Sequence, residues 1–192
     1  MKSLKLLAAG LAVACASDPI SKHPANAEIQ REVREIVKRV RVQTGAMLYD
    51  DLKRLVAFDV FAVEQVSVLA EDPNARLRSN AMWVLAQIRD PERKEAMKTI
   101  DRTLRRGLKD VDPIVRFEAA SGLASRGDWD VLPHLIDGLE DRDSAVRYGC
   151  NAQLVSTTSR DFGYSADASV EQRQTAVERW RSFYADWRKS RS

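Results

Sequence analysis

The sequence predicts an all-α protein, and two observations support that prediction. No stretch of the 192 residues alternates apolar and polar side chains with the period of two that marks a half-buried β-strand. Apolar residues recur instead at helical spacing, and one such pattern occurs three times along the chain. Hydrophobic residues make up 44% and charged residues 31%, a balance typical of a folded globular domain.

Residues 1–14 have the features of an export signal. Lys2 and Lys5 precede an apolar run, Leu6–Ala14, and small residues follow it. As a helix this run would rise only about 14 Å, too short for a hydrocarbon core of about 30 Å. Two cleavage positions remain open from the residues alone. Cleavage after Ala16 would discard Cys15, whereas cleavage before Cys15 would make that cysteine the mature N-terminus.

The stretch "LAVAC", which ends at Cys15, resembles the lipobox of bacterial lipoproteins. The resemblance implies that Cys15 becomes the acylated N-terminus and anchors the protein to a membrane. Because Ala16 and not aspartate follows, it also implies the outer membrane, with the protein facing the periplasm. A soluble secreted or periplasmic protein is the alternative. Residues 15–27 lack apolar periodicity and contain two prolines, so they predict a flexible tether, in which His23 is an incidental residue.

A helical repeat domain is predicted over residues 28–158. Its first helix, Ala27–Val42, has apolar residues at helical spacing after Asn26 as a cap. Further helices are predicted within 46–59 and 60–72. Gly45 is a candidate break, but the apolar pattern nearly continues through it. The sequence therefore leaves open whether residues 28–57 form one helix or two.

The repeat is centred on an arginine. An aliphatic residue stands one place before each arginine, a small residue three places after and a leucine seven places after, which places them on one helix face. An aspartate lies six places before, and a capping residue lies four places before. The arginines are Arg78, Arg116 and Arg147, the aspartates are Asp72, Asp110 and Asp141, and the caps are Asn74, Asp112 and Asp143. The small residue of the third repeat is Cys150, which we interpret as a core residue and not as a nucleophile.

A second helix is predicted before each repeat helix. Residues 98–110 and 130–143 align through their leucines, Leu104 with Leu135 and Leu108 with Leu139. The segment 159–192 is predicted to be a loop and a terminal capping helix. Ser169 and Gln172 form a capping-box pattern, and an apolar stripe containing Trp180 follows them.

The motif "DVDPIVRFEAASGL" at residues 110–123 resembles the HEAT-like repeats found in phycobilisome lyase subunits, and the resemblance covers residues 47–158. It implies a right-handed α-solenoid of stacked antiparallel helix pairs, in which the second helix of each pair lines a concave face. It also implies that the repeated aspartates and arginines form a structural ladder between neighbouring turns.

Patterns for catalysis are missing from the sequence. There is no glycine-rich phosphate loop, nucleophile elbow, HExxH or CxxC motif, so we predict no enzyme activity, no cofactor and no metal site. The formal charge of +3 does not indicate a nucleic-acid-binding protein. The sequence therefore favours a lipid-anchored scaffold that binds a protein or peptide in the bacterial cell envelope. A lyase-like accessory subunit or enzyme that acts on a tetrapyrrole or envelope substrate is the alternative, and a structural lipoprotein without a specific ligand is a third.

The candidate binding residues come from the aligned second helices. Thr103 and Arg106 stand opposite His134 and Asp137, off the leucine columns. We expect these four side chains to project into the concave face, where their mixed charge would favour a polar protein segment over a polyanion.

Overall fold

The computed structural model describes residues 24–191, which contain α-helices and two 3-10 helices but no β-strand. The predicted all-α class is therefore confirmed for this part of the chain. The elements are α2 (Pro24–Val42), α3 (Gly45–Ala57), η1 (Asp59–Ala62), α4 (Val63–Leu69), α5 (Ala75–Gln87), α6 (Lys94–Gly107), α7 (Pro113–Ala124), η2 (Trp129–Val131), α8 (Leu132–Gly138), α9 (Ser144–Thr158) and α10 (Val170–Lys189). The predicted signal segment, Cys15 and His23 lie outside the described residues.

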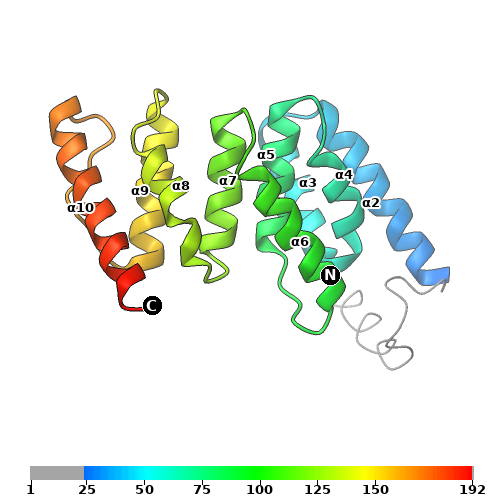
Figure 1. Cartoon of the computed structure of the whole chain (residues 1–192). Helices are drawn as coiled ribbons and strands as arrows, with labels where there is room; N and C mark the ends of the chain where they lie inside the picture. The colour runs from blue at the N-terminus through cyan, green and yellow to red at the C-terminus, as the bar shows by residue number, and fades with distance from the viewer. Residues whose placement is uncertain (1–23, 192) are drawn as a thin grey trace.

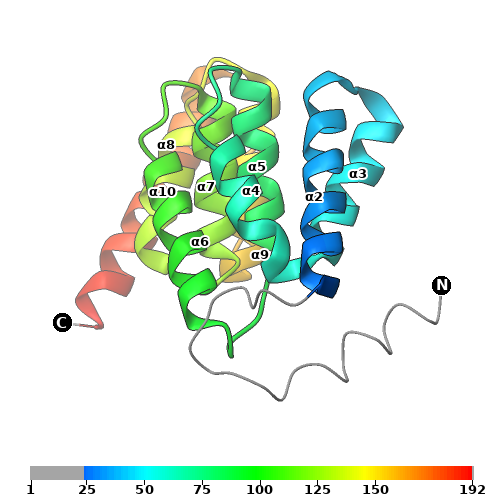
Figure 2. The same cartoon turned by 90° about the vertical axis from the view of Figure 1, so that its right-hand side faces the viewer.

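The helices follow one another in chain order from α2 at one end of the molecule to α10 at the other (Figure 1). They pack in two rows. Helices α3, α5, α7 and α9 contact one another in sequence, and α2, α4 and α6 form the second row, which α8 and α10 continue. Figure 2 looks along these rows from the α2 end. The junction between α6 and α8 is looser than the others in its row. None of the helices within residues 24–191 combines the length and apolar content needed to cross a bilayer.

The first two helices settle what the sequence left open. Helix α2 ends at Val42 and α3 begins at Gly45, so residues 28–57 form two helices. Gly45 has φ of +62°, a left-handed conformation that glycine adopts without the strain other residues meet. Helix α2 begins at Pro24, three residues before the predicted start, because proline fits the first turn of a helix, where its missing N–H is not needed.

The three repeat helices begin with the same set of hydrogen bonds. In each turn an aspartate Oδ1 accepts a hydrogen bond of 2.9 Å from the backbone N–H two residues later. The side chain of that later residue then accepts from the first turn of the helix, which confirms the predicted caps. The aspartates and their caps are Asp72 with Asn74, Asp110 with Asp112, and Asp141 with Asp143.

Each repeated arginine closes its own turn. Its Nη1 donates to the carbonyl oxygens six and five residues earlier, at distances of 2.8–3.0 Å. These bonds pair backbone acceptors that the turn would otherwise leave without an internal donor. The arginines that make them are Arg78, Arg116 and Arg147.

Only part of the predicted ladder extends between turns. Arg78 donates from Nε and Nη2 to both carboxylate oxygens of Asp110, at 2.8 and 2.7 Å. Arg147 instead donates to the Ala166 carbonyl, and in the described chain Arg116 forms no ion pair with Asp141. The expected Arg116–Asp141 rung is therefore wrong. Helix α8, which leads into the Asp141 turn, has 7 residues where α6 has 14, and we attribute the missing rung to this shorter approach.

Small residues allow the rows to pack closely. The leucines of the repeat, Leu85, Leu123 and Leu154, are fully buried, as is the small-residue column. Gly138 in α8 lies directly against Cys150 in α9, so an added Cβ would overlap the cysteine Sγ. Burial raises the pKa of the Cys150 thiol to about 12, so the thiolate does not form near neutral pH. Both observations support the interpretation of Cys150 as a core residue.

Helix α10 closes the end of the array. Ser169 and Gln172 form the predicted capping box, and Ala176, Val177 and Trp180 are buried. The Trp180 ring meets Phe162 edge to face, with centroids 4.6 Å apart. Arg181 pairs with Glu140 at 2.5 Å and Arg188 with Asp130 at 3.1 Å. These contacts cover the outer side of α8, as the predicted capping helix requires.

We predict that Gly138→Ala lowers the free energy of unfolding by about 1–3 kcal/mol, because the new methyl group overlaps the Cys150 Sγ. The same change in a Cys150→Ala background should cost much less, since the sulfur is gone. Urea unfolding followed by circular dichroism measures all four chains of this cycle. Equal costs in the two backgrounds would contradict the contact.

We predict that Arg78→Ala lowers the free energy of unfolding by about 2–4 kcal/mol and Arg116→Ala by about 1–2 kcal/mol. Both changes remove the two carbonyl bonds, but only the first removes the Asp110 pair, whose side chains are 13% and 14% exposed. Equal losses in urea unfolding at pH 7 would contradict this assignment.

The same pair predicts a pH dependence. The Arg78 hydrogen bonds hold the pKa of Asp110 below its ordinary value, and the Asp112 N–H adds to this effect. A carboxyl with a lowered folded-state pKa stabilises the fold above its unfolded-state pKa and loses that contribution as the pH falls through the folded value. The stability difference between wild type and Arg78→Ala should therefore be full at pH 7 and shrink below about pH 4. A difference that stays constant down to pH 3 would contradict it.

Candidate functional site

The predicted binding residues do not form one cluster. Thr103 is only 4% exposed, and its hydroxyl donates to the Thr99 carbonyl at 2.9 Å. The expectation that Thr103 projects from the surface is therefore wrong, because its position on α6 faces the packed neighbouring helices. Arg106, His134 and Asp137 are exposed. Arg106 belongs to α6 and the other two to α8, across the loose junction between these helices.

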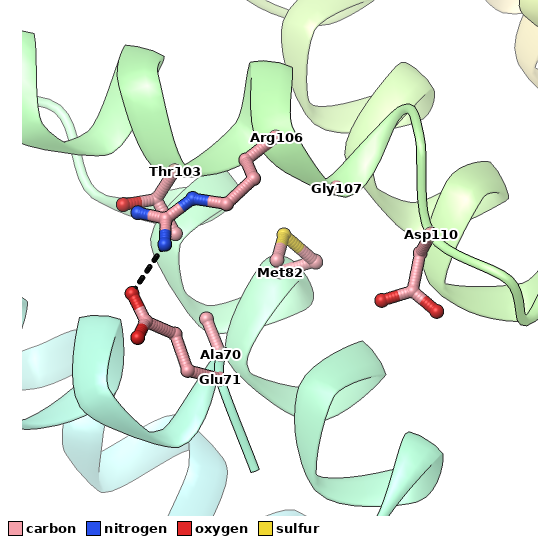
Figure 3. Close-up of a pocket in the computed structure, with 7 residues that line it drawn as sticks. All are labelled: Ala70, Glu71, Met82, Thr103, Arg106, Gly107 and Asp110. Carbon is pink, nitrogen blue, oxygen red and sulfur yellow. Dashed lines mark hydrogen bonds and ion pairs between the residues drawn. The ribbon is translucent and has the colours of Figure 1, made fainter. Parts of the chain in front are cut away.

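Arg106 pairs with Glu71, which follows α4, and a small hollow lies beneath this ion pair (Figure 3). Ala70, Met82 and Gly107 give the hollow an apolar floor. Its remaining lining residues are Thr103 and Asp110, of which Asp110 stands at the edge away from the ion pair. The volume is about 50 Å³. Pockets for small molecules measure about 300–1,000 Å³, so this hollow can hold water or the end of one side chain but not a substrate.

A larger hollow adjoins the first and shares Glu71 with it. It is wide open to solvent, has a volume of about 400 Å³, and is lined by Arg41, Ser67, Val68, Glu71, Asp72 and Pro73. Val68 is 63% exposed, and the buried Ser67 hydroxyl has no hydrogen-bond partner. Arg41 pairs with Asp72 at the rim. The backbone N–H of Asn74 and the Arg41 guanidinium lower the pKa of Asp72, so the carboxyl stays ionised.

We call the residues Arg41, Ser67, Val68, Glu71 and Arg106 the Glu71 surface. It combines one exposed apolar side chain, Val68, with three charged groups of both signs, contributed by the region of α2, α4 and α6, while the hydroxyl of Ser67 is buried. Glu71 and Arg106 are each more than half exposed, so their ion pair contributes little to stability and can open to a new partner. The arrangement suits recognition of a chain segment with both apolar and polar groups.

Four residues of this surface escaped the sequence analysis, which found only Arg106. A sequence signal existed for Arg41, because it stands 31 residues before Asp72, close to the 32 residues that separate Arg78 from Asp110. Glu71 directly precedes the repeated Asp72. No sequence pattern marked Ser67 or Val68, because their place in the lining of the hollow depends on how α4 packs against α2 and α6.

Titratable side chains elsewhere in residues 24–191 form no second candidate for a functional site. Within residues 24–191 no three His, Cys, Asp or Glu side chains gather as a metal site requires. Burial raises the pKa of Glu118 on α7 to about 7, but no ion pair or side-chain hydrogen bond joins it to another described residue. No protein-family model matches the chain, and no curated protein sequence matches it.

Proposed function

We propose that this protein is a non-enzymatic scaffold built as a right-handed α-solenoid of HEAT-like repeats. The two helix rows and the three turns with identical hydrogen bonds support this architecture. Helix arrays of this kind bind partners along extended surfaces. The proposed ligand is a protein or peptide segment, and no cofactor or nucleic acid takes part.

The single observation that carries this function is the Glu71 surface. An exposed valine beside the open hollow can bury an apolar side chain of the partner. Arg41, Glu71 and Arg106 supply both signs of charge, which favours a polar polypeptide over a polyanion.

The proposed location is the bacterial cell envelope, with the protein anchored through acylated Cys15 to the outer membrane and facing the periplasm. The lipobox resemblance of "LAVAC" supports it. A soluble secreted or periplasmic form is the alternative.

We predict that Val68→Asp weakens partner binding at least tenfold, because it places a charge in the apolar part of the contact. The partner is first captured from envelope membranes by crosslinking to the tagged full chain, identified by mass spectrometry, and then purified for a binding titration. The control is Val111→Asp, which changes a valine that is 90% exposed on the turn between α6 and α7. Both variants should unfold at the wild-type temperature when heating is followed by circular dichroism, since both side chains lie largely in water. Equal affinities for the two variants would overturn the assignment to the Glu71 surface.

We predict that Cys15→Ser releases the protein from membranes or leaves it unprocessed, because no thiol remains to be acylated. Membrane fractionation and mass spectrometry of the mature N-terminus measure the result. Cys150→Ser is the control and should leave both unchanged. An unmodified N-terminus at Ser17 in the wild type would show cleavage after Ala16 and end the lipid-anchor proposal.

A further inference from the structure

Two arginines converge on one carbonyl oxygen at the end of α5. Arg126, in the loop after α7, donates from Nη1 to the Ile88 carbonyl at 2.8 Å. Arg89 donates from its own Nη1 to the same oxygen at 3.1 Å, and also to the Ala86 carbonyl. The two cationic groups are therefore held side by side by neighbouring repeats, although like charges repel.

No carboxylate in the described chain forms an ion pair with either arginine. Within residues 24–191 neither arginine lies within ion-pair distance of an Asp or Glu side chain, and both guanidinium groups share the Ile88 carbonyl as an acceptor. Asp101 acts on Arg126 electrostatically, but Arg105 already binds its carboxylate at 3.0 Å. Asp90 accepts from the backbone N–H of Glu92.

This environment lowers the pKa of both guanidinium groups. Partial burial lowers the pKa of Arg89, and repulsion from Arg126 lowers it further. Burial also lowers the pKa of Arg126, although Asp101 opposes the shift. An anion bound between the two groups would remove the repulsion that the fold itself leaves in place.

The donors that remain determine which anion fits. Arg89 makes both of its bonds through Nη1, so its Nε and Nη2 groups have no hydrogen-bond partner among residues 24–191. Arg126 donates from Nη2 to the Met97 Sδ at 3.3 Å. A guanidinium presents its donors in a planar fork that matches the oxygens of phosphate or carboxylate. Two adjacent guanidinium groups, with two positive charges, therefore match a tetrahedral, multiply charged oxyanion better than they match a single carboxylate.

We propose that Arg89 and Arg126 form a binding site for a phosphate group. The site needs no part of the Glu71 surface, which lies toward the opposite ends of these helices, where the aspartate turns are.

Two sources of phosphate are compatible with the geometry. The first residues of α2 and the loop between α5 and α6, which carries Arg89, lie at the same end of the helix array in both views (Figures 1 and 2). If Cys15 is lipidated, as proposed above, the chain enters the helix array from the membrane at this end, which brings the two arginines within reach of the phosphates of anionic lipid headgroups. Free inorganic phosphate offers the same chemistry without a membrane.

The first experiment titrates inorganic phosphate into the full-length protein at constant ionic strength, followed by calorimetry and by the NMR signals of the arginine Nε–H groups. Wild type should bind, and Arg89→Gln with Arg126→Gln should lower the affinity at least tenfold. Arg102→Gln is the control, because it removes one exposed charge from α6 without touching the pair. Should Arg126→Gln unfold the chain, Arg89→Gln alone decides, since Arg89 is an exposed residue.

The second experiment compares flotation with vesicles of phosphatidylglycerol and of phosphatidylcholine. The N-terminal segment is the same in every variant, so a difference between variants isolates the arginines. Loss of the preference for phosphatidylglycerol in the double variant identifies a lipid headgroup, and loss of inorganic phosphate binding alone identifies free phosphate. If the double variant matches wild type and Arg102→Gln in both experiments, the two arginines only cap the end of α5 and the proposal is overturned.

Discussion

The closed aspartate turn is the constraint on which the rest of this structure depends. Each turn must reverse the chain between two helices while leaving no buried backbone group without a partner. Asp72, Asp110 and Asp141 each hold the backbone N–H of the capping residue, and the arginine six places later binds the carbonyl groups of the same turn. The start and direction of α5, α7 and α9 follow from these bonds, and the two helix rows follow from those directions.

The strength of the link between turns varies along the array. Arg78 and Asp110 join two turns through a paired, mostly buried contact, whereas Arg116 closes its own turn without reaching Asp141. The loose α6–α8 junction coincides with this missing rung. Gly138 against Cys150 and α10 against α8 hold the later part of the array together by close packing and capping instead. We therefore expect local opening to begin at the α6–α8 junction, where few contacts must break.

The surface chemistry follows from the same architecture. Residues at helix ends that do not serve a turn are left partly exposed, so Val68, Glu71 and Arg106 meet across neighbouring helices and form shallow hollows. A volume of about 50 Å³ beneath an exposed ion pair is too small for a substrate, and the adjoining hollow is too open to exclude water. Surface recognition of a chain segment fits this geometry. The paired Arg89 and Arg126 lie toward the other end of the helices. The proposals of a peptide-binding surface and of a phosphate site can therefore be tested, and can fail, independently.

The sequence by itself determined the all-α class, the three caps, the capping box at Ser169 and the core position of Cys150. Each of these depends on residues close together in the chain or on a periodic pattern, which local hydrogen bonding and helix geometry translate directly into structure. Only the tertiary structure decided which rungs of the ladder form, that Thr103 is buried, and that Glu71, Val68 and Arg41 share a surface. It alone brought Arg89 and Arg126 to one carbonyl oxygen. These outcomes depend on helix lengths and on the angles at which distant helices meet, and no local pattern encodes those quantities.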